Sequence, residues 1–497
     1  MYIKKQWHFI RMSYWKYLIH IGIFLFLIIF YTKISPLIPY DSDDWIYLSH
    51  TRVPFPLWDA WNPTRVFAED IMMLGGYIAG SVIYPMIHDY LAAVMLTSAV
   101  ILSGLITVMC VCVELLFEKR MKASIKLASA MEVLFLMLCF LIFRNKSNSL
   151  HLFSAADLCC VYFYTMSGLL NMIVAMIILR YNNFAEIFSG FSLLKKIGML
   201  ILIYFAVFSN LFHSGILVCL CIVKIIYMAL HELCSKKKEW KYLIMSSIPY
   251  ILIILLWIVA AIFELFGGRA ARFADTPIDI KLPLMQLKAL LMALSKPYIF
   301  IWLFFLIINI FFGVKNRKKR SLSELNLIFN NLIGWLVILT IYLIGLCSKV
   351  AYLSRLDASI GLWLVLNLIL VVLVYKTITM LMQIKWKSNK IGIISYILIL
   401  FLCIYPDGKY KPSIFGNENF QTAFAVNQEI IKQFLEVEVK GTDEVYLHIP
   451  DYSGTQLEAL MNEGIGECIQ DTLFAHGVIQ RKVDIVVFKD FERWTEK

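Results

Sequence analysis

Residues 91–117 have the sequence LAAVMLTSAVILSGLITVMCVCVELLF, in which Glu114 is the one charged side chain. A helix of this length rises about 40 Å, which exceeds the roughly 30 Å hydrocarbon core of a bilayer. Similar apolar runs recur along most of the chain, and 60% of its 497 residues are hydrophobic whereas 16% are charged. A water-soluble protein has too few polar residues at this composition to cover its apolar surface. The sequence therefore predicts an all-α polytopic protein in a lipid bilayer.

Eleven apolar runs have the length expected of membrane spans. Their predicted bounds are 17–38, 91–117, 127–143, 159–180, 197–211, 214–230, 242–265, 298–313, 329–348, 360–383 and 391–405. The continuous run 197–230 is too long for one crossing, so we divide it at the polar break between Ser209 and Ser214. Residues 1–38 resemble a signal peptide, but no small-residue cleavage site follows, so we predict that this first span is retained.

A twelfth apolar run, residues 66–87, is predicted to lie on the membrane surface without crossing it. With this arrangement most Lys and Arg residues gather in the loops of one side, which the positive-inside rule makes cytoplasmic. The N-terminus is then cytoplasmic and the C-terminus extracytoplasmic. The chain is rich in Ile, Lys and Asn, which suggests an AT-rich bacterial genome, so we expect the membrane to be a bacterial plasma membrane. The net charge of +11 follows from this topology, so no nucleic-acid partner is expected.

The composition changes after Tyr405, which divides the chain into a membrane domain, 1–405, and an extracytoplasmic α/β domain, 406–497. The hydrophobic pattern of the second domain predicts helices at 418–438 and 456–476 and strands at 444–449 and 483–488. Nine of the eleven cysteines, including Cys159 and Cys160, lie in or beside apolar runs. We interpret these nine as small hydrophobic packing residues.

The first outer loop, residues 39–90, begins with Pro39-Tyr40-Asp41-Ser42-Asp43-Asp44-Trp45. Adjacent carboxylates repel, which raises the pKa of one of them unless a cation is near. One interpretation is an ordinary helix start, because Asp and Ser are good N-caps. The other is a sugar-phosphate site, since aromatic and basic side chains follow the acids in the same loop. The residues concerned are Trp45, Trp61 and Arg65.

A second outer segment, Gly267-Gly268-Arg269-Ala270-Ala271-Arg272, places two arginines three residues apart. On a helix they would point the same way, and the planar guanidinium suits phosphate. The simpler interpretation is that Arg269 and Arg272 reach toward lipid headgroups. Individually weaker candidates lie on the same predicted side, where polar groups at membrane depth tend to be functional. They are Asp157, Tyr164, His213, Arg355 and Asp357.

The pattern resembles the GT-C superfamily of integral membrane glycosyltransferases. The resemblance rests on the acidic pair Asp43-Asp44 in the first outer loop, the surface segment after it, the many spans and the C-terminal outer domain. The Gly267–Arg272 segment resembles a Pro-Gly-Asn…Arg segment of bacterial branches that include relatives of the O-antigen glucosyltransferases. Here Gly-Gly stands in place of Pro-Gly-Asn.

The resemblance implies an inverting transfer of a monosaccharide from a polyprenyl-phosphate donor to a cell-surface glycan. The acceptor would be of the cell-wall polysaccharide, teichoic acid or O-antigen type. Asp43 would act as general base and Asp44 would orient it or the acceptor. The donor phosphate would be bound by Arg269 and Arg272, with Arg65, His213 and Arg355 as further candidates. The sugar or acceptor would contact Asp41, Trp45 and Trp61. We expect these loop substitutions to change stability little.

No cofactor is expected, and the alternative is a divalent metal held by Asp41, Asp43 and Asp44, whose hard oxygen ligands suit such an ion. An O-antigen-type polymerase, which differs in its donor, is chemically close to this function. Two functions of other classes also stay open. One is a flippase or transporter of lipid-linked glycans, and the other is a membrane scaffold with an outer sensing domain. Neither the sugar nor the oligomeric state follows from the residues.

Overall fold

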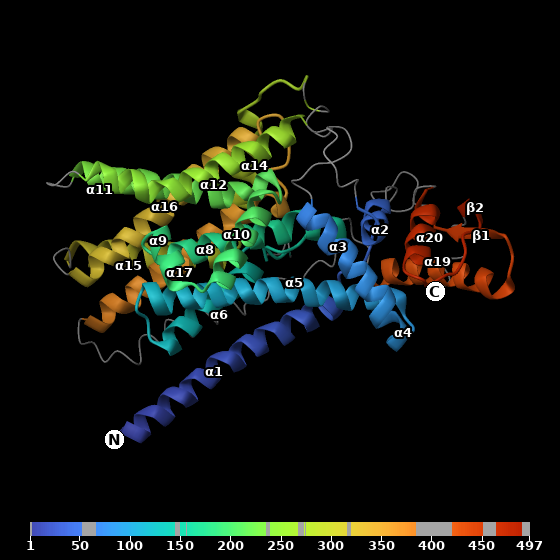
Figure 1. Ribbon diagram of the computed structural model, residues 1–497, viewed down its shortest axis with the longest axis horizontal. Coiled ribbons are helices and arrows are strands. Elements are labelled where there is room, and N and C mark those ends of the chain that lie inside the picture. Colours follow the sequence, from blue (N-terminus) through green and yellow to red (C-terminus); the bar gives the residue numbers. More distant parts are fainter. Residues whose placement is uncertain are drawn as a thin grey trace.

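The computed structural model describes residues 2–51, 66–144, 150–155, 157–234, 239–266, 273, 275–315, 320–383, 420–450 and 464–489. These residues form a bundle of long helices with a small α/β module at one end (Figure 1). The predicted boundary between the two domains, at 405 and 406, lies outside the described residues.

Ten helices run along the bundle in the described part of the chain. They are α1 (Tyr2–Ile29), α5 (Tyr90–Leu115), α6 (Ile125–Leu141), α8 (Ser167–Arg180), α10 (Leu193–Val207), α11 (Leu211–Cys234), α12 (Trp240–Phe266), α15 (Lys296–Lys315), α16 (Arg320–Leu346) and α17 (Leu356–Gln383). The shorter helices are α2 (Ser42–Ser49), α3 (Val66–Ile78), α4 (Tyr84–Ile87), α7 (Leu158–Cys160), α9 (Phe184–Gly190) and α14 (Lys281–Met292). Wider π-helical turns continue several of them, namely η1 (Phe30–Ile34), η3 (Ala79–Ile83), η4 (Leu116–Arg120) and η5 (Val161–Met166).

Eight helices within the described ranges are long and apolar enough to cross a membrane. The bent pair α14 and α15, whose axes differ by 91°, adds a ninth if it counts as one span. The polytopic all-α fold agrees with the prediction, but the total of eleven spans is not confirmed. Helices α6 and α10 have only 17 and 15 residues, and the predicted span 391–405 lies outside the described residues. The chain does break between α10 and α11, beside the predicted polar break.

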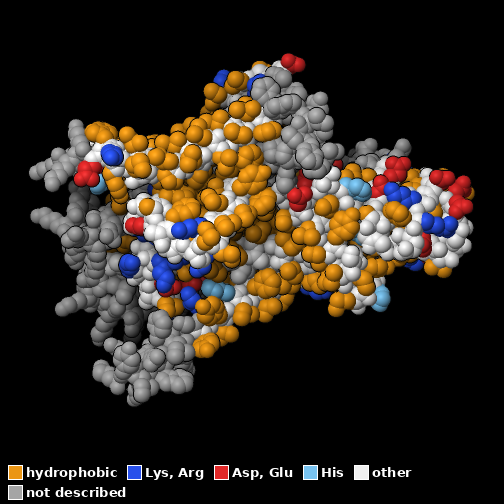
Figure 2. Space-filling view, in the orientation of Figure 1, with side chains coloured by type: hydrophobic (Ala, Val, Ile, Leu, Met, Phe, Trp, Pro, Cys, Tyr) orange, Lys and Arg blue, Asp and Glu red, His pale blue; other side chains and the backbone are white. Residues whose placement is uncertain are grey.

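The surface of the bundle is apolar, as a lipid environment requires. On the face shown in Figure 2, hydrophobic side chains cover most of the bundle where residues are described. Charged side chains gather mainly toward the ends of the bundle and over the module. Large exposed apolar side chains lie on the outer helices, for example Leu194, Leu252 and Phe311. Almost every residue of α8 and α17 is buried, so these two helices form the centre of the bundle.

The surface segment α3–α4 lies across the end of the bundle that carries α2, which we call the α2 end (Figure 1). Near its start, Ala68 packs with Tyr164 and with Ala358 at the beginning of α17. Farther along, a Cβ added to Gly76 would lie 2.1 Å from the Leu48 carbonyl oxygen, so α3 touches the backbone of α2. Both contacts belong to the same end. The surface position of this segment stays a prediction, because 67–87 also has the length and composition of a span.

The position of α3–α4 predicts a labelling pattern. Asp70→Cys and Asp89→Cys should both react with a membrane-impermeant thiol reagent added outside, because both positions lie at the α2 end. Lys119 is exposed and lies on η4, which continues α5 toward the end of the bundle opposite α2. Lys119→Cys should therefore stay unlabelled in intact cells. The measurement uses a Cys234→Ser background, since Cys234 is exposed. Reaction at position 70 with protection at 89 would instead indicate a crossing.

The C-terminal module has the predicted order of helix, strand, helix and strand. It consists of α19 (Phe420–Lys440), β1 (Glu444–Ile449), α20 (Ile465–Ala475) and β2 (Asp484–Lys489). The two strands are parallel, with Glu444 opposite Asp484, and α20 makes the crossover that parallel strands need. Buried apolar side chains from both helices and from β1 form its small core. They include Ile430, Phe434, Leu447, Ile469 and Leu473.

The module is anchored to the first loop by hydrogen bonds. The Thr472 hydroxyl donates to the Trp45 carbonyl oxygen at 2.6 Å. His476 donates from Nε2 to the Leu48 carbonyl oxygen at 3.1 Å and accepts at Nδ1 from the Tyr90 hydroxyl at 2.6 Å. Burial lowers the pKa of His476 to about 4, so the ring is neutral. The module and the first loop therefore lie on one side, opposite the N-terminus of α1 (Figure 1). The cytoplasmic position of that N-terminus stays a prediction.

Candidate functional site

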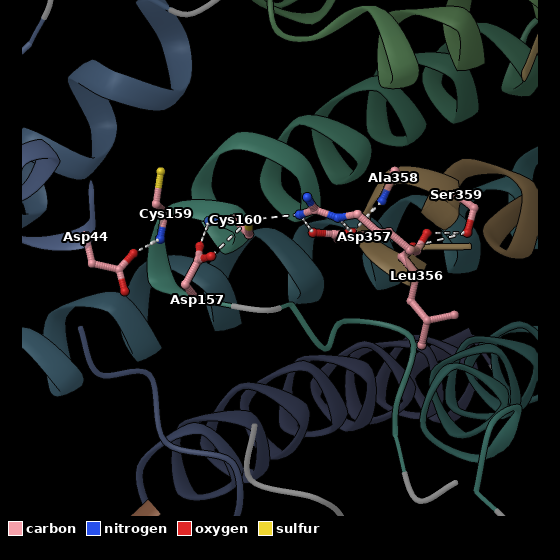
Figure 3. A network of polar contacts seen from close by, with 9 residues as sticks. Asp44, Asp157, Cys159, Cys160, Leu356, Asp357, Ala358 and Ser359 are labelled. Atoms are coloured by element: carbon pink, nitrogen blue, oxygen red, sulfur yellow. Dashed lines mark hydrogen bonds and ion pairs between the residues drawn. The ribbon is translucent and has the colours of Figure 1, made fainter. Parts of the chain in front are cut away.

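The polar groups of the α2 end come from three segments far apart in sequence. Helix α2 supplies the acids of the first loop, the start of α7 supplies Asp157, and the loop before α17 supplies Arg355 (Figure 3). These segments meet because α7 and α17 both begin at this end of the bundle. The structure thus brings several of the predicted residues together.

The acidic stretch forms an ordinary helix start, which was the simpler of the two interpretations of its sequence. Asp41 is its N-cap and accepts a hydrogen bond from the Asp44 backbone N–H at 3.0 Å. Acidic groups in a first helical turn are also favoured by the helix dipole. Asp43 differs from its neighbours because its side chain is exposed and forms no hydrogen bond with any residue that the structure describes. Of the three carboxylates, Asp43 is the one left free for a ligand.

Asp44 is fully buried and binds backbone groups of two segments. It accepts hydrogen bonds from the N–H of Tyr40 at 2.7 Å, of Leu158 at 3.2 Å and of Cys159. The carboxylate therefore caps the helix that begins at Leu158 and fastens the first loop to it. This burial corrects the expectation that substitutions in the loop change stability little, because that expectation assumed side chains near water.

Asp157 lies beside the first-loop acids and caps the same helix, accepting from the Cys160 backbone N–H. Burial, together with the nearby charge of Asp157, raises the pKa of Asp41 to about 6. The same two causes raise the pKa of Asp44 well above its ordinary value. Burial also raises the pKa of Asp157. Three carboxyl groups around one helix start cannot all ionise at low cost, so the cluster retains a proton more readily than separate aspartates do.

Arg355 and Asp357 form a bidentate ion pair on the neighbouring side of the cluster. Arg355 donates from Nη2 to Asp357 at 2.6 Å and from Nε at 3.1 Å. Nη2 also donates to the Cys160 sulfur at 2.9 Å, and the Cys160 thiol donates to Asp157 at 3.3 Å. A chain of polar contacts thereby joins the acids to Arg355 (Figure 3). The side chain of Arg355 is 33% exposed, and its Nη1 makes no hydrogen bond within the described ranges.

Tyr164 and His213 lie on the inner side of Arg355. The guanidinium carbon is 4.8 Å from the centre of the Tyr164 ring, and the His213 ring packs edge-on to that ring at 5.9 Å. His213 is fully buried, and neither of its ring nitrogens has a hydrogen-bond partner among the residues described. In this arrangement His213 is therefore out of reach of a phosphate.

The other predicted site residues are placed as follows. Trp45 is fully buried and stacks on Tyr90, with ring centres 6.3 Å apart, so a sugar could contact the ring only if it were uncovered. Four further predicted residues lie outside the described residues, namely Trp61, Arg65, Arg269 and Arg272.

The chemistry of the cluster fits helix capping better than metal binding. Of the predicted metal ligands Asp41, Asp43 and Asp44, only Asp44 belongs to a group with metal-ligand spacing, which also includes Asp157 and Cys159. The Asp44 oxygens already accept three backbone N–H groups, so few of their lone pairs remain for a cation. The divalent-metal alternative therefore gains no support from the first loop.

Cys160 is more than the packing residue that its apolar surroundings predict, because its thiol bridges Asp157 and Arg355. The ring of Tyr352 lies 5.5 Å from the Arg355 guanidinium, and no sequence pattern marks this tyrosine as part of the site. The available signal was the position of Asp157 directly before the apolar run 159–180, which begins with Cys159 and Cys160 on the predicted outer side. Comparisons of the chain with models of protein families, with curated proteins and with solved structures found no match.

Proposed function

We propose that this protein is a membrane glycosyltransferase that transfers a monosaccharide from a polyprenyl-phosphate donor to a glycan on the outer face of a bacterial plasma membrane. The supporting observation is a group of polar contacts at one end of an apolar bundle. Asp44 of the acidic helix α2 accepts a hydrogen bond from the Cys159 backbone N–H, and the thiol of the next residue, Cys160, joins Asp157 to Arg355. The Asp43 carboxylate on this helix is exposed and the Arg355 guanidinium is partly exposed, so we expect both to be open to a lipid phosphate that arrives from the bilayer.

The proposed step needs one base and one group that binds the leaving phosphate. The acceptor hydroxyl gives its proton to the Asp43 carboxylate as its oxygen bonds to the anomeric carbon. The bond from that carbon to the phosphate oxygen breaks, and the polyprenyl phosphate leaves with the electron pair. Arg355 would stabilise this charge through Nη1, with Arg269 and Arg272 as further predicted phosphate ligands. Attack opposite the leaving group inverts the anomeric centre.

The neighbouring acids would position the base. Asp44 fixes α2 against the start of the helix at Leu158, so its role is to hold Asp43 in place. Asp41 lies near enough to Asp157 for that charge to raise the pKa of Asp41, and it remains the candidate contact for a sugar or acceptor hydroxyl. The C-terminal module supports α2 from the other side through Thr472.

The test supplies the purified protein with a polyprenyl-phosphate sugar, labelled in the sugar, and a cell-surface glycan. We expect release of polyprenyl phosphate together with label in the glycan. In sealed vesicles that contain the protein, label that crosses the bilayer while still attached to the lipid would support the flippase interpretation. Neither release nor crossing, tested over several sugars, would contradict both functions and favour the scaffold.

A further inference from the structure

A second cluster of ionisable side chains lies inside the bundle, toward the end opposite α2. It consists of His20 on α1, Glu114 on α5 and Glu132 on α6. Both glutamates are fully buried. Each of the three appears in the sequence as an isolated polar residue in an apolar run, and the packing of α1 against α5 and α6 brings them together.

The ligating atoms of the cluster converge on one point. His20 Nε2 lies 3.3 Å from Glu114 Oε2 and 3.3 Å from Glu132 Oε2. One oxygen from each carboxylate and the ring nitrogen all lie within 4.8 Å of one another. Ligands about 2.0 Å from a tetrahedral zinc ion are about 3.3 Å apart, so the two nitrogen-to-oxygen distances match the edge of such a site.

The hydrogen bonding of these atoms is incomplete in a way that points to a ligand. Four atoms of the cluster make no hydrogen bond with any residue that the structure describes, namely both oxygens of Glu132, Glu114 Oε2 and His20 Nε2. The ring nitrogen is equally distant from the two carboxylates and is aligned with neither. Glu114 Oε1, by contrast, accepts from the buried Ser129 hydroxyl at 3.2 Å, which orients the carboxylate with Oε2 toward the cluster. Buried carboxylates without hydrogen bonds are costly unless a cation compensates them.

The nearest lysine compensates the cluster only in part. Lys16 Nζ is 3.9 Å from Glu114 but 3.5 Å from Glu118, which lies nearer the end of the bundle. A protonated His20 would leave the group of His20, Glu114 and Glu132 with one net negative charge. A divalent cation with a neutral imidazole would leave it with none.

We propose that His20, Glu114 and Glu132 form a binding site for a divalent transition metal of the zinc type. One imidazole nitrogen and two carboxylate oxygens suit such an ion, and the partly exposed His20 leaves a side open for entry and for a further ligand. The site is separate from the α2 end and does not depend on the proposed transfer reaction. Its physical effect would be to fasten α1 to α5 and α6.

The experiment measures zinc binding by the full-length protein in detergent. The affinity tag contains no histidine and the background is Cys234→Ser, because a histidine tag and the exposed Cys234 thiol would themselves bind zinc. After removal of metal with a chelator, we expect one zinc ion per chain and a higher melting temperature on its return. Glu132→Gln should weaken zinc affinity by at least the roughly 10–100-fold that loss of an outer-shell partner costs. Ser129→Ala should fall within that range, and Glu118→Gln, which alters a neighbouring carboxylate outside the cluster, should bind as the parent does.

A measurement on the unsubstituted cluster covers the case in which Glu132→Gln does not fold. Co²⁺ added to the metal-free protein should give visible absorption bands of a tetrahedral nitrogen and oxygen site, and Zn²⁺ should displace them. If the parent protein gives no such bands and zinc leaves its melting temperature unchanged, the metal site is excluded. The cluster is then an ion pair around a protonated His20. Equal zinc affinity of the parent and a folded Glu132→Gln variant would overturn the proposal as well.

Discussion

Replacement of Asp43 by Asn is expected to lower the rate of sugar transfer about 10²–10⁴-fold, the usual contribution of a general base. Asparagine keeps the size of the side chain but cannot accept the proton of the acceptor hydroxyl. The melting temperature should not change, because Asp43 is exposed and its carboxylate binds no described residue. The measurement compares single-turnover transfer rates at saturating donor with the melting temperature in the same detergent.

Asp70→Asn is the matched control for this prediction. Asp70 is an exposed aspartate on α3 at the same end of the bundle, so its substitution removes an equal charge without touching the proposed base. Its transfer rate should stay close to that of the parent protein. A folded Asp43→Asn protein that transfers sugar at the parental rate would contradict the assignment of the base to Asp43.

Asp41 is the other carboxylate that could then act as base, and pH distinguishes the two cases. Because burial and the nearby Asp157 raise the pKa of Asp41 to about 6, a reaction that needs its ionised form slows as the pH falls through about 6. If Asp41 is the base, Asp41→Asn should lose transfer activity at every pH, whereas Asp43→Asn should keep the fall in rate near pH 6. If Asp41→Asn also transfers at the parental rate, neither Asp43 nor Asp41 is the base, and the assignment of the base to the first loop fails.

The elements of the fold could be predicted where a short-range pattern determines them. The alternation of Glu444 to Ile449 placed β1 at its observed bounds. The apolar runs likewise placed the central helices α8 and α17. The number of spans was harder to predict, because α6 and α10 are short and because 66–87 is as apolar as a span yet lies across one end of the bundle.

The roles of adjacent acids could not be predicted from the sequence. Asp43 and Asp44 are chemically identical neighbours, but one is exposed and the other is fully buried. The difference arises because Asp44 meets the backbone of Leu158 and Cys159, more than a hundred residues away in sequence. The same holds for Glu114 and Glu132, which reach His20 only through the packing of three helices. Contacts between distant segments decide which polar residue is structural and which is available.

Replacement of Asp44 by Asn tests that structural role, and we expect it to destabilise the protein by about 1–3 kcal/mol, the cost of a buried backbone group left without a partner. An amide offers one acceptor oxygen where the carboxylate offers two, and its NH₂ group would face the backbone N–H of Leu158 or Cys159. The loss should appear as a lower melting temperature in detergent, without any substrate present.

Asp41→Asn is the control that separates this effect from the removal of charge. Each substitution removes one carboxylate from the same cluster, but Asn is as good an N-cap as Asp, so position 41 should keep its bond to the Asp44 N–H and its stability. A clear fall in melting temperature for Asp44→Asn with little change for Asp41→Asn assigns the stabilisation to the three hydrogen bonds of Asp44. Equal melting temperatures for both variants and the parent would mean that the first loop is held by other contacts, with the hydrogen bonds of Thr472 and His476 to α2 as the next to remove.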